Sequence, residues 1–205
     1  LAEIKPLAAD AFYQHCDVRN ASDVLQWRDA IVSRWQHINV VINNAGVATF
    51  GSIDQCSLAD WDWVIDINLM GVVRGCKYFS EVFKQQGFGH IVNTASMAGL
   101  VHSPEMSSYN ATKAAVVALS ETLRGELRPY GIDVTVVCPG FFPTNLAEST
   151  RSPDAGAQAL VAKMLSRSKI GADDIANMIF SAIEQKKYLV LPHPSYRRLW
   201  YLKRF

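Results

Sequence analysis

The chain has 205 residues, 49% of them hydrophobic, and a formal net charge of +1 at pH 7. This length suits a single domain with a large core, and the near-zero charge excludes a strong electrostatic attraction to nucleic acid or to an anionic membrane. No apolar run reaches the ~18 residues of a membrane-spanning helix, and the cysteines form no Cys-x-x-Cys pair, so a reduced, cytoplasmic protein is expected.

Strand-like and helix-like segments alternate along the chain. Strands are predicted at residues 11–16, 39–43, 90–94, 133–138 and 188–191. Helices are predicted at residues 21–36, 58–85, 107–128 and 173–185. This alternation predicts an α/β fold, a doubly wound parallel sheet with helices on both faces and right-handed crossovers. The segment 141–170 is the least regular, because prolines and a glycine interrupt it.

Tyr109 and Lys113 stand four residues apart in the third predicted helix, and Ser96 precedes the tyrosine by thirteen residues. Residues at the first spacing share one helix face, so the lysine ammonium is expected to lower the pKa of the tyrosine phenol. One charge at ~4 Å and an effective dielectric constant of ~20 supplies about 4 kcal/mol, enough for acid or base work near neutral pH. Such pairs are also common as solvated surface neighbours, and the spacing alone leaves that alternative open.

Further patterns accompany this trio. The strand at 39–43 runs into Asn43-Asn44-Ala45-Gly46. Small and amide residues at the carboxyl end of such a strand are where a doubly wound sheet binds its ligand. Asn68 lies inside the second predicted helix, and Pro139-Gly140 follow another apolar strand.

Together with Asp17-Val18 and Thr144, these motifs occur in an order and spacing that resembles the short-chain dehydrogenase/reductase family, from about residue 10 to residue 192. The resemblance implies a Rossmann-type fold and an NAD(P)-dependent oxidoreductase that transfers a hydride between nicotinamide and a carbonyl or secondary alcohol. Its implied catalytic residues are Asn68, Ser96, Tyr109 and Lys113. In these roles Tyr109 is the acid or base, and Ser96 hydrogen-bonds the reacting oxygen. Lys113 holds the nicotinamide ribose, and Asn68 holds a water.

The same resemblance implies the contacts with NAD or NADP, made by Asp17, Val18, Asn44, Ala45, Gly46, Tyr109, Lys113, Pro139, Gly140, Phe142 and Thr144. Small side chains in this set let the backbone approach the adenosine ribose. Family members commonly carry a β-branched residue where Phe142 stands. At this position the contact with the cofactor is therefore expected from the backbone, whereas the side chain differs. Plainer roles stay open for single residues: Asp17 as a helix cap, Ser96 as a turn residue, and Asn68 as a polar residue satisfied within its helix.

The chain departs from the family at its start. No glycine-rich turn precedes Asp17, and residues 1–10 look like the end of a helix that enters the strand at 11–16. An N-terminal βαβ segment with that turn is therefore expected to be missing from this chain. The residues that choose between NAD and NADP would lie in that segment.

Residues 1–205 are expected to form one dinucleotide-binding oxidoreductase domain, in which segment 141–170 is a lid and residues 193–205 are a tail. Around the predicted site lie Val101, Pro104, Met106, Phe141 and Phe142, an apolar set that predicts a bulky, apolar carbonyl or alcohol substrate. The alternative that these side chains fold inward as the core of the lid stays open. His102, in the same loop as the first three, either selects the substrate or is a neutral bystander.

Partners are predicted from the ends and faces of the chain. The tail interleaves basic and aromatic residues, and two placements stay open: contact with a membrane surface, or packing on its own domain or a neighbouring subunit. A homodimer or homotetramer is expected through the helices at 58–85 and 107–128, as in the family. The histidines show no metal-ligand spacing, so no metal is predicted.

A second function stays open beside the oxidoreductase. It is a non-catalytic dinucleotide-binding sensor or scaffold with the same fold. The intact set of Asn68, Ser96, Tyr109 and Lys113 favours the enzyme. A sensor has no chemical need for a proton donor opposite the nicotinamide.

Overall fold

The computed structural model of the protein describes residues 8–204, and within them the central feature is a parallel sheet with the strand order β1-β3-β4-β6. Its strands are β1 (Val40–Asn43), β3 (Gly89–Thr94), β4 (Ile132–Val137) and β6 (Leu189–Val190). Two short strands, β2 (Ala48–Thr49) and β5 (Thr150–Arg151), pair in parallel outside this sheet. The predicted parallel sheet is confirmed, and its four strands lie within about one residue of the predicted bounds.

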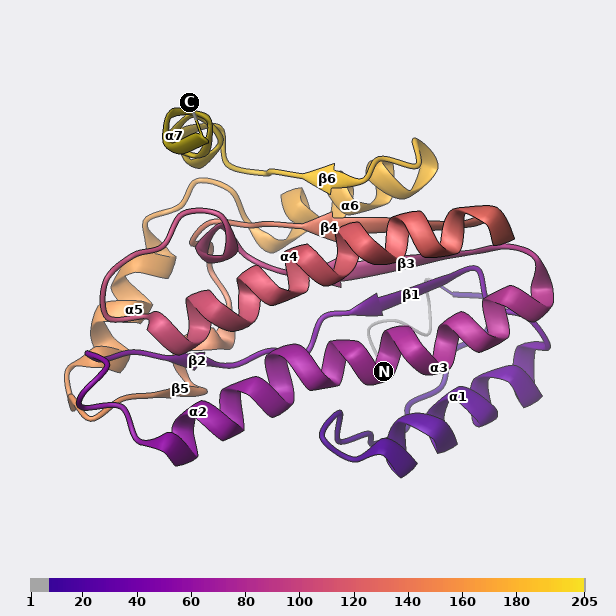
Figure 1. Ribbon diagram of the computed structural model, residues 1–205, viewed down its shortest axis with the longest axis horizontal. Helices are drawn as coiled ribbons and strands as arrows, with labels where there is room; N and C mark the ends of the chain where they lie inside the picture. The colour runs from indigo at the N-terminus through magenta and orange to yellow at the C-terminus, as the bar shows by residue number, and fades with distance from the viewer. Residues whose placement is uncertain (1–7, 205) are drawn as a thin grey trace.

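Helices cover the sheet on both faces, as Figure 1 shows. The helices are α1 (Ala21–Trp35), α2 (Leu58–Ile65), α3 (Gly71–Gln86), α4 (Ser107–Leu127), α5 (Ala157–Ser166), α6 (Ala172–Glu184) and α7 (Pro194–Arg204). Short helical turns lie at η2 (Asp66–Met70), η3 (Met97–Gly99), η4 (Arg128–Tyr130) and η5 (Asn145–Ala147). In Figure 1, α3 and α4 run across the front of the sheet, and α1 packs against α3.

Neighbouring residues of each strand face two different cores, because side chains alternate along a strand. Ile91 packs with the α3 and α4 side chains in the larger core, whereas Val92 packs on the α6 side. In the same way, Val136 packs in the larger core and Val137 packs on the α6 side. The continuous apolar strands of the sequence therefore reflect burial on both faces, as expected for a parallel sheet between helices.

The strand predicted at residues 11–16 is wrong. This segment belongs to no ladder, and the part of the chain that the structure describes provides no strand beside it. Side chains hold it on α1 instead, since Asp10 pairs with Arg34 and the Phe12 ring lies edge-on against Trp35 at 5.4 Å. A strand requires a partner for its backbone groups, and the described residues offer this segment none. The helix end predicted for residues 1–10 falls largely outside the described residues.

The helix predicted at 58–85 is interrupted at η2, a π-helical turn. There the Gly71 N–H bonds to the carbonyl of Asp66, five residues earlier. Arg74 supports the turn by pairing with the Asp66 carboxylate at 2.7 Å. Such turns insert one residue into a helix and often occur at functional sites. This one carries Asn68.

The segment 141–170 and the tail contain more regular structure than predicted. The segment holds η5, β5 and α5, and β5 pairs with β2 outside the main sheet. The tail forms α7, whose Tyr196 and Trp200 pack on the larger core. Of the placements left open for the tail, packing on its own domain is therefore the one seen. None of the helices within residues 8–204 combines the length and hydrophobicity that crossing a membrane requires.

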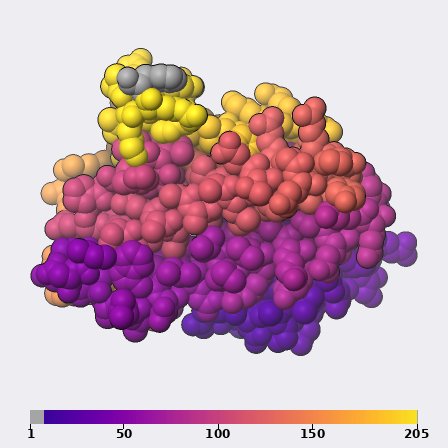
Figure 2. Space-filling model, in the orientation of Figure 1, coloured from indigo at the N-terminus to yellow at the C-terminus, as the bar shows by residue number. Residues whose placement is uncertain are grey.

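Helices α2 and α3 follow one another end to end through η2, and α4 lies beside them on one broad face, which fills the front of Figure 2. The two-fold contact predicted through residues 58–85 and 107–128 would involve these helices. The contact itself stays a prediction.

Candidate active site

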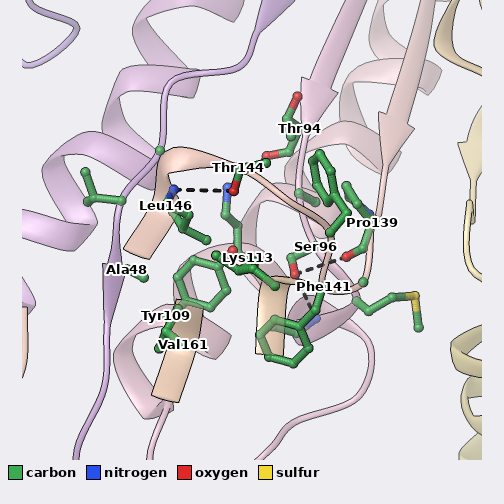
Figure 3. A pocket seen from close by; sticks show the side chains of 18 of the residues that line it. Ala48, Thr94, Ser96, Tyr109, Lys113, Pro139, Phe141, Thr144, Leu146 and Val161 are labelled. Atoms are coloured by element: carbon green, nitrogen blue, oxygen red, sulfur yellow. Dashed lines mark hydrogen bonds between the residues drawn. The ribbon is translucent and has the colours of Figure 1, made fainter. Parts of the chain in front are cut away.

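The carboxyl ends of β1, β3 and β4 meet at one edge of the sheet, where the structure has a cavity of about 840 Å³. Asn44, Ser96 and Gly140 each follow one of these strands and line the cavity. The start of α4 closes it from the side with Tyr109 and Lys113. Figure 3 shows Ser96, Tyr109 and Lys113 in this pocket, with Phe141 and Leu146 beside them.

Ser96 is held in place by the turn that follows β3. Its extended backbone, with φ at −169°, caps η3, and its Oγ accepts a hydrogen bond from the Ala98 N–H at 3.1 Å. The Oγ in turn donates to the Pro139 carbonyl oxygen at 3.4 Å. Ser96 is therefore both a turn cap and a cavity residue, and the two sequence interpretations are compatible.

Lys113 is directed from α4 toward the end of β3. Its Nζ donates to the Thr94 carbonyl oxygen at 2.9 Å and lies 5.8 Å from the centre of the Tyr109 ring. Both side chains are buried, with exposed fractions of 4% and 7%. The solvated-surface alternative for this pair is therefore wrong.

The expected lowering of the Tyr109 pKa is not found in this structure. Burial raises the pKa of the phenol, and a hydrogen bond with Ser96 opposes that increase in part. Burial also lowers the pKa of the Lys113 ammonium from 10.5 to about 8, although the nearby Cys138 thiol acts in the other direction. Desolvation disfavours the charged form of each group. It therefore outweighs the mutual attraction assumed from the spacing.

Asn68 is fully buried below the loop that follows β1. Its Oδ1 accepts from the Val47 N–H at 2.8 Å, and its Nδ2 donates to the Val47 carbonyl at 2.9 Å. It is thus not satisfied within its own helix, because the π-helical turn directs its amide toward another segment. Asn68 fixes the backbone next to Gly46.

The predicted cofactor residues fall into two groups. One lines the cavity and comprises Asn44, Gly46, Tyr109, Lys113, Pro139, Gly140, Phe142 and Thr144. The other lies outside the lining: Asp17 pairs with Arg19 at 2.6 Å, Val18 packs against Gly71, and Ala45 is exposed. The helix cap proposed as an alternative for Asp17 is made by Asn20 instead, which accepts from the Ser22 N–H.

The lining residues fit the ribose end of a dinucleotide. A Cβ at Gly46 would stand 3.4 Å from the Lys113 Nζ and 3.5 Å from the Asn68 Oδ1. The missing side chain thus keeps open the space beside the ammonium, where ribose hydroxyls would find a donor. The hydroxyl of Thr144 borders the same cavity.

Some residues that shape the site escaped the sequence analysis. Asn93 is buried under it, accepts from the Asn43 amide at 2.8 Å and donates to Ser120 at 3.0 Å, so it joins β1, β3 and α4. A polar residue within an apolar strand was the signal that could have found it. Apolar wall residues also come from segments expected to be irregular: Leu146, Val161, Leu165, Tyr196 and Leu199.

Histidine, cysteine and acidic side chains within residues 8–204 form no group of three that could hold a metal ion. The histidines have other contacts. His90 bonds to Thr135 at 2.7 Å, and His193 accepts from the Gly140 N–H at 3.0 Å. The ambiguous His102 has its Nδ1 3.2 Å from the Lys203 Nζ on the tail.

Replacing Lys113 with methionine is expected to raise the free energy of unfolding at pH 7. The pKa depression from 10.5 to about 8 corresponds to a cost of about 3 kcal/mol for the buried charge, at 1.36 kcal/mol per tenfold change in proton affinity. Because the folded-state pKa lies below the unfolded value, this cost is full below pH 8 and disappears as the pH rises to 10.5. Urea unfolding of both proteins at a series of pH values measures it.

The decisive quantity is the difference in the free energy of unfolding between Lys113→Met and the unchanged protein, because the other groups titrate alike in both. It should favour the methionine variant at pH 7 and shrink above pH 8. A difference that does not change with pH would contradict a buried ammonium at position 113. The hydrogen bond lost at the Thr94 carbonyl gives a constant offset.

Comparison with known proteins gives consistent matches. The family model described as short chain dehydrogenase matches residues 1–155. "Probable oxidoreductase EphD" of Mycobacterium tuberculosis is 32% identical over 195 residues, which cover 91% of this chain and 33% of EphD. The chain thus spans about a third of that relative's length. "3-oxoacyl-[acyl-carrier-protein] reductase FabG" of Staphylococcus aureus is 33% identical over 192 residues, 91% of this chain and 76% of FabG.

Solved structures match over nearly the whole chain. The crystal structure of a short chain dehydrogenase/reductase from Burkholderia phymatum in complex with NAD has a TM-score of 0.93 and 32% identity. The match covers 99% of this chain and 78% of that one.

Proposed function

The chain belongs to the short-chain dehydrogenase/reductase family, as an oxidoreductase with its Rossmann-type fold, and we propose that it transfers a hydride between NAD or NADP and a bulky, apolar carbonyl compound or secondary alcohol. One observation carries the proposal. A buried phenol, a hydroxyl and an ammonium meet at the same largely apolar cavity. The relatives agree, since FabG is named as a reductase of 3-oxoacyl groups and the Burkholderia protein was crystallised with NAD.

Reduction of a carbonyl needs a proton and a hydrogen-bond donor at the same oxygen. A bound NADH or NADPH would supply the hydride that the carbonyl carbon accepts. As negative charge grows on the oxygen, the Ser96 hydroxyl stabilises it and the Tyr109 phenol transfers its proton to it. The product is the alcohol. Because burial raises the pKa of Tyr109, the phenol stays protonated at neutral pH, the form required in this direction.

Lys113 and Asn68 act through position and charge. The Lys113 ammonium would hold the nicotinamide ribose beside Gly46. With a pKa of about 8 it is mostly charged at neutral pH, so it favours the phenolate that forms as the proton leaves Tyr109. Asn68 fixes the Val47 backbone along this binding surface. We keep for Asn68 the further role of holding a water that links the lysine to solvent.

The lining supports an apolar substrate. Val101, Met106, Phe141 and Phe142 border the cavity as expected, together with Leu146 and Val161, whereas Pro104 of the same predicted set is not part of the lining. Among the described residues, Lys113 and Glu148 are the charged members of the lining, and Arg151 is not part of it. A carboxylate or phosphate would meet no forked arginine there and would face an acidic group instead.

A ketone panel is expected to show this preference. The value of kcat/KM for a long-chain or steroid-sized ketone should exceed that for a small polar ketone by at least about tenfold, because each buried methylene adds binding free energy. The rate of NADH or NADPH consumption measures it for each cofactor in turn. A preference for the small polar ketone would contradict the apolar substrate class.

The same assay separates the enzyme from the sensor or scaffold. Calorimetric binding of NAD or NADP without turnover of any ketone, aldehyde or alcohol would favour the sensor. Turnover of any member of the panel favours the enzyme. Dimer and tetramer remain proposals that the mass in solution tests.

A further inference from the structure

The C-terminal helix α7 forms part of the wall of the cavity that would hold the proposed reaction. In Figure 2 its yellow atoms stand above the surface formed by residues around position 100. Two of its side chains, Tyr196 and Leu199, line the cavity, and Trp200 packs on the larger core. These three positions follow the helix period, so one side of α7 faces the body of the protein.

The N-terminal end of α7 is fixed to the loop after β4. His193, directly before the helix, is buried and its Nδ1 accepts from the Gly140 N–H at 3.0 Å. Its Nε2 lies 3.3 Å from the Ser168 hydroxyl, which follows α5. The Tyr196 ring sits where Gly140 has no side chain, since a Cβ at Gly140 would stand 2.5 Å from that ring. Tyr196 thus lies against the residue that follows Pro139, whose carbonyl oxygen accepts from Ser96.

The other end of α7 is fixed to the loop after β3. Lys203 donates to the Leu100 carbonyl oxygen at 3.0 Å and lies 3.2 Å from the His102 Nδ1. Val101, between these two residues, also lines the cavity. The helix is therefore anchored to both loops that border the reacting groups, which holds Tyr196 and Leu199 at fixed positions in the wall.

We propose that α7 is the substrate-selecting wall of this site, with Tyr196 and Leu199 as specificity-determining residues that contact the apolar part of the substrate. This inference rests on the proposed function and adds to it. Tyr196 is close to Ser96 through the Pro139-Gly140 backbone and contacts the substrate near its reacting carbon. Leu199 is 46% exposed, so it lies at the rim and contacts a long chain that extends outward.

The test compares two leucines of the same helix. Leu199→Ala is expected to lower the ratio of kcat/KM for a long-chain methyl ketone to that for acetone by about tenfold, the effect of losing apolar contact with the chain. Leu202→Ala is the matched control, because Leu202 is 77% exposed and not in the cavity lining. Its ratio should stay within about twofold of the unchanged protein. Thermal unfolding of each variant checks that α7 remains folded.

Lys203→Met adds a second variant that leaves the wall residues unchanged. Releasing the far end of α7 should lower the same ratio, by less than Leu199→Ala does, because Leu199 is then less firmly held. Calorimetric binding of the long-chain ketone is measured for all variants as a readout independent of turnover. Weaker binding in Leu199→Ala than in Leu202→Ala is the expected order.

The possible outcomes distinguish a wrong assignment of α7 from a wrong proposed function. If the unchanged protein reduces both ketones and Leu199→Ala keeps the ratio, α7 is not the selecting wall. If no ketone is turned over but Leu199→Ala still weakens binding of the long-chain ketone relative to Leu202→Ala, the assignment of α7 is supported and the proposed reaction is contradicted. If the long-chain ketone neither binds nor reacts, the wall assignment is overturned together with the substrate class.

Discussion

Replacing Tyr109 with phenylalanine is expected to lower kcat for carbonyl reduction by about 10² to 10⁴-fold, the range typical of losing a general acid. The affinity for NAD or NADP should change little, because the phenyl ring keeps the packing of a residue that is 7% exposed. Single-turnover kinetics with saturating cofactor measure the chemical step, and calorimetry measures the binding. The split between the two readouts identifies a proton donor rather than a packing residue.

Tyr130→Phe is the matched control. Tyr130 ends the turn η4 after α4, is 47% exposed and does not line the cavity. Loss of its hydroxyl should therefore leave both kcat and cofactor affinity unchanged. Turnover of Tyr109→Phe close to that of Tyr130→Phe would remove the phenol from the proposed mechanism.

The sheet edge and the reacting groups could be predicted from local patterns. Apolar runs mark β1, β3 and β4, and parallel strands bring Asn44, Ser96 and Gly140 to one edge whatever the details of packing. The spacing of Tyr109 and Lys113 places both on one side of α4. These predictions depend on the periods of helices and strands, which the sequence displays directly.

Other features depend on tertiary contacts, so the sequence concealed them. The π-helical turn that directs Asn68 toward Val47 is supported by Arg74 and Asp66, a pair that an ordinary helix would also accommodate. The direction of the Tyr109 pKa depends on burial, which spacing does not reveal. The placement of α7 depends on packing, because the interleaved basic and aromatic residues of the tail suit a membrane surface as well as the core on which Tyr196 and Trp200 pack.

Gly99→Ala is expected to lower kcat/KM by at least about 10²-fold and the free energy of unfolding by roughly 1 to 3 kcal/mol. Gly99 ends η3, and a Cβ there would stand 2.6 Å from the carbonyl oxygen of Lys113 and 3.0 Å from the backbone N of Ala114. Backbone atoms of α4 cannot rotate away as a side chain would. The turn that carries Ser96 and the helix that carries Lys113 must therefore move apart.

The expected loss of kcat/KM in Gly99→Ala is large because the movement separates the groups that react. Ser96 caps η3, and Tyr109 and Lys113 belong to α4, so a separation of η3 from α4 displaces the hydroxyl from the phenol. Displacements of about 1 Å between reacting groups can cost about 100-fold in rate. A loss of stability with unchanged kcat/KM would contradict this coupling, because it would show that the added methyl is accommodated away from Ser96.

Gly125→Ala provides the control within α4, with the opposite sign of stability change. A Cβ at Gly125 meets no atom within 4 Å, and alanine is favoured over glycine inside a helix by about 0.5 to 1 kcal/mol. This variant should unfold at higher urea concentration and keep its activity. Its mass in solution is measured as well, since α4 belongs to the predicted two-fold contact. If the two glycine variants behaved alike, the contact between η3 and α4 would not be what holds Ser96 and Tyr109 together.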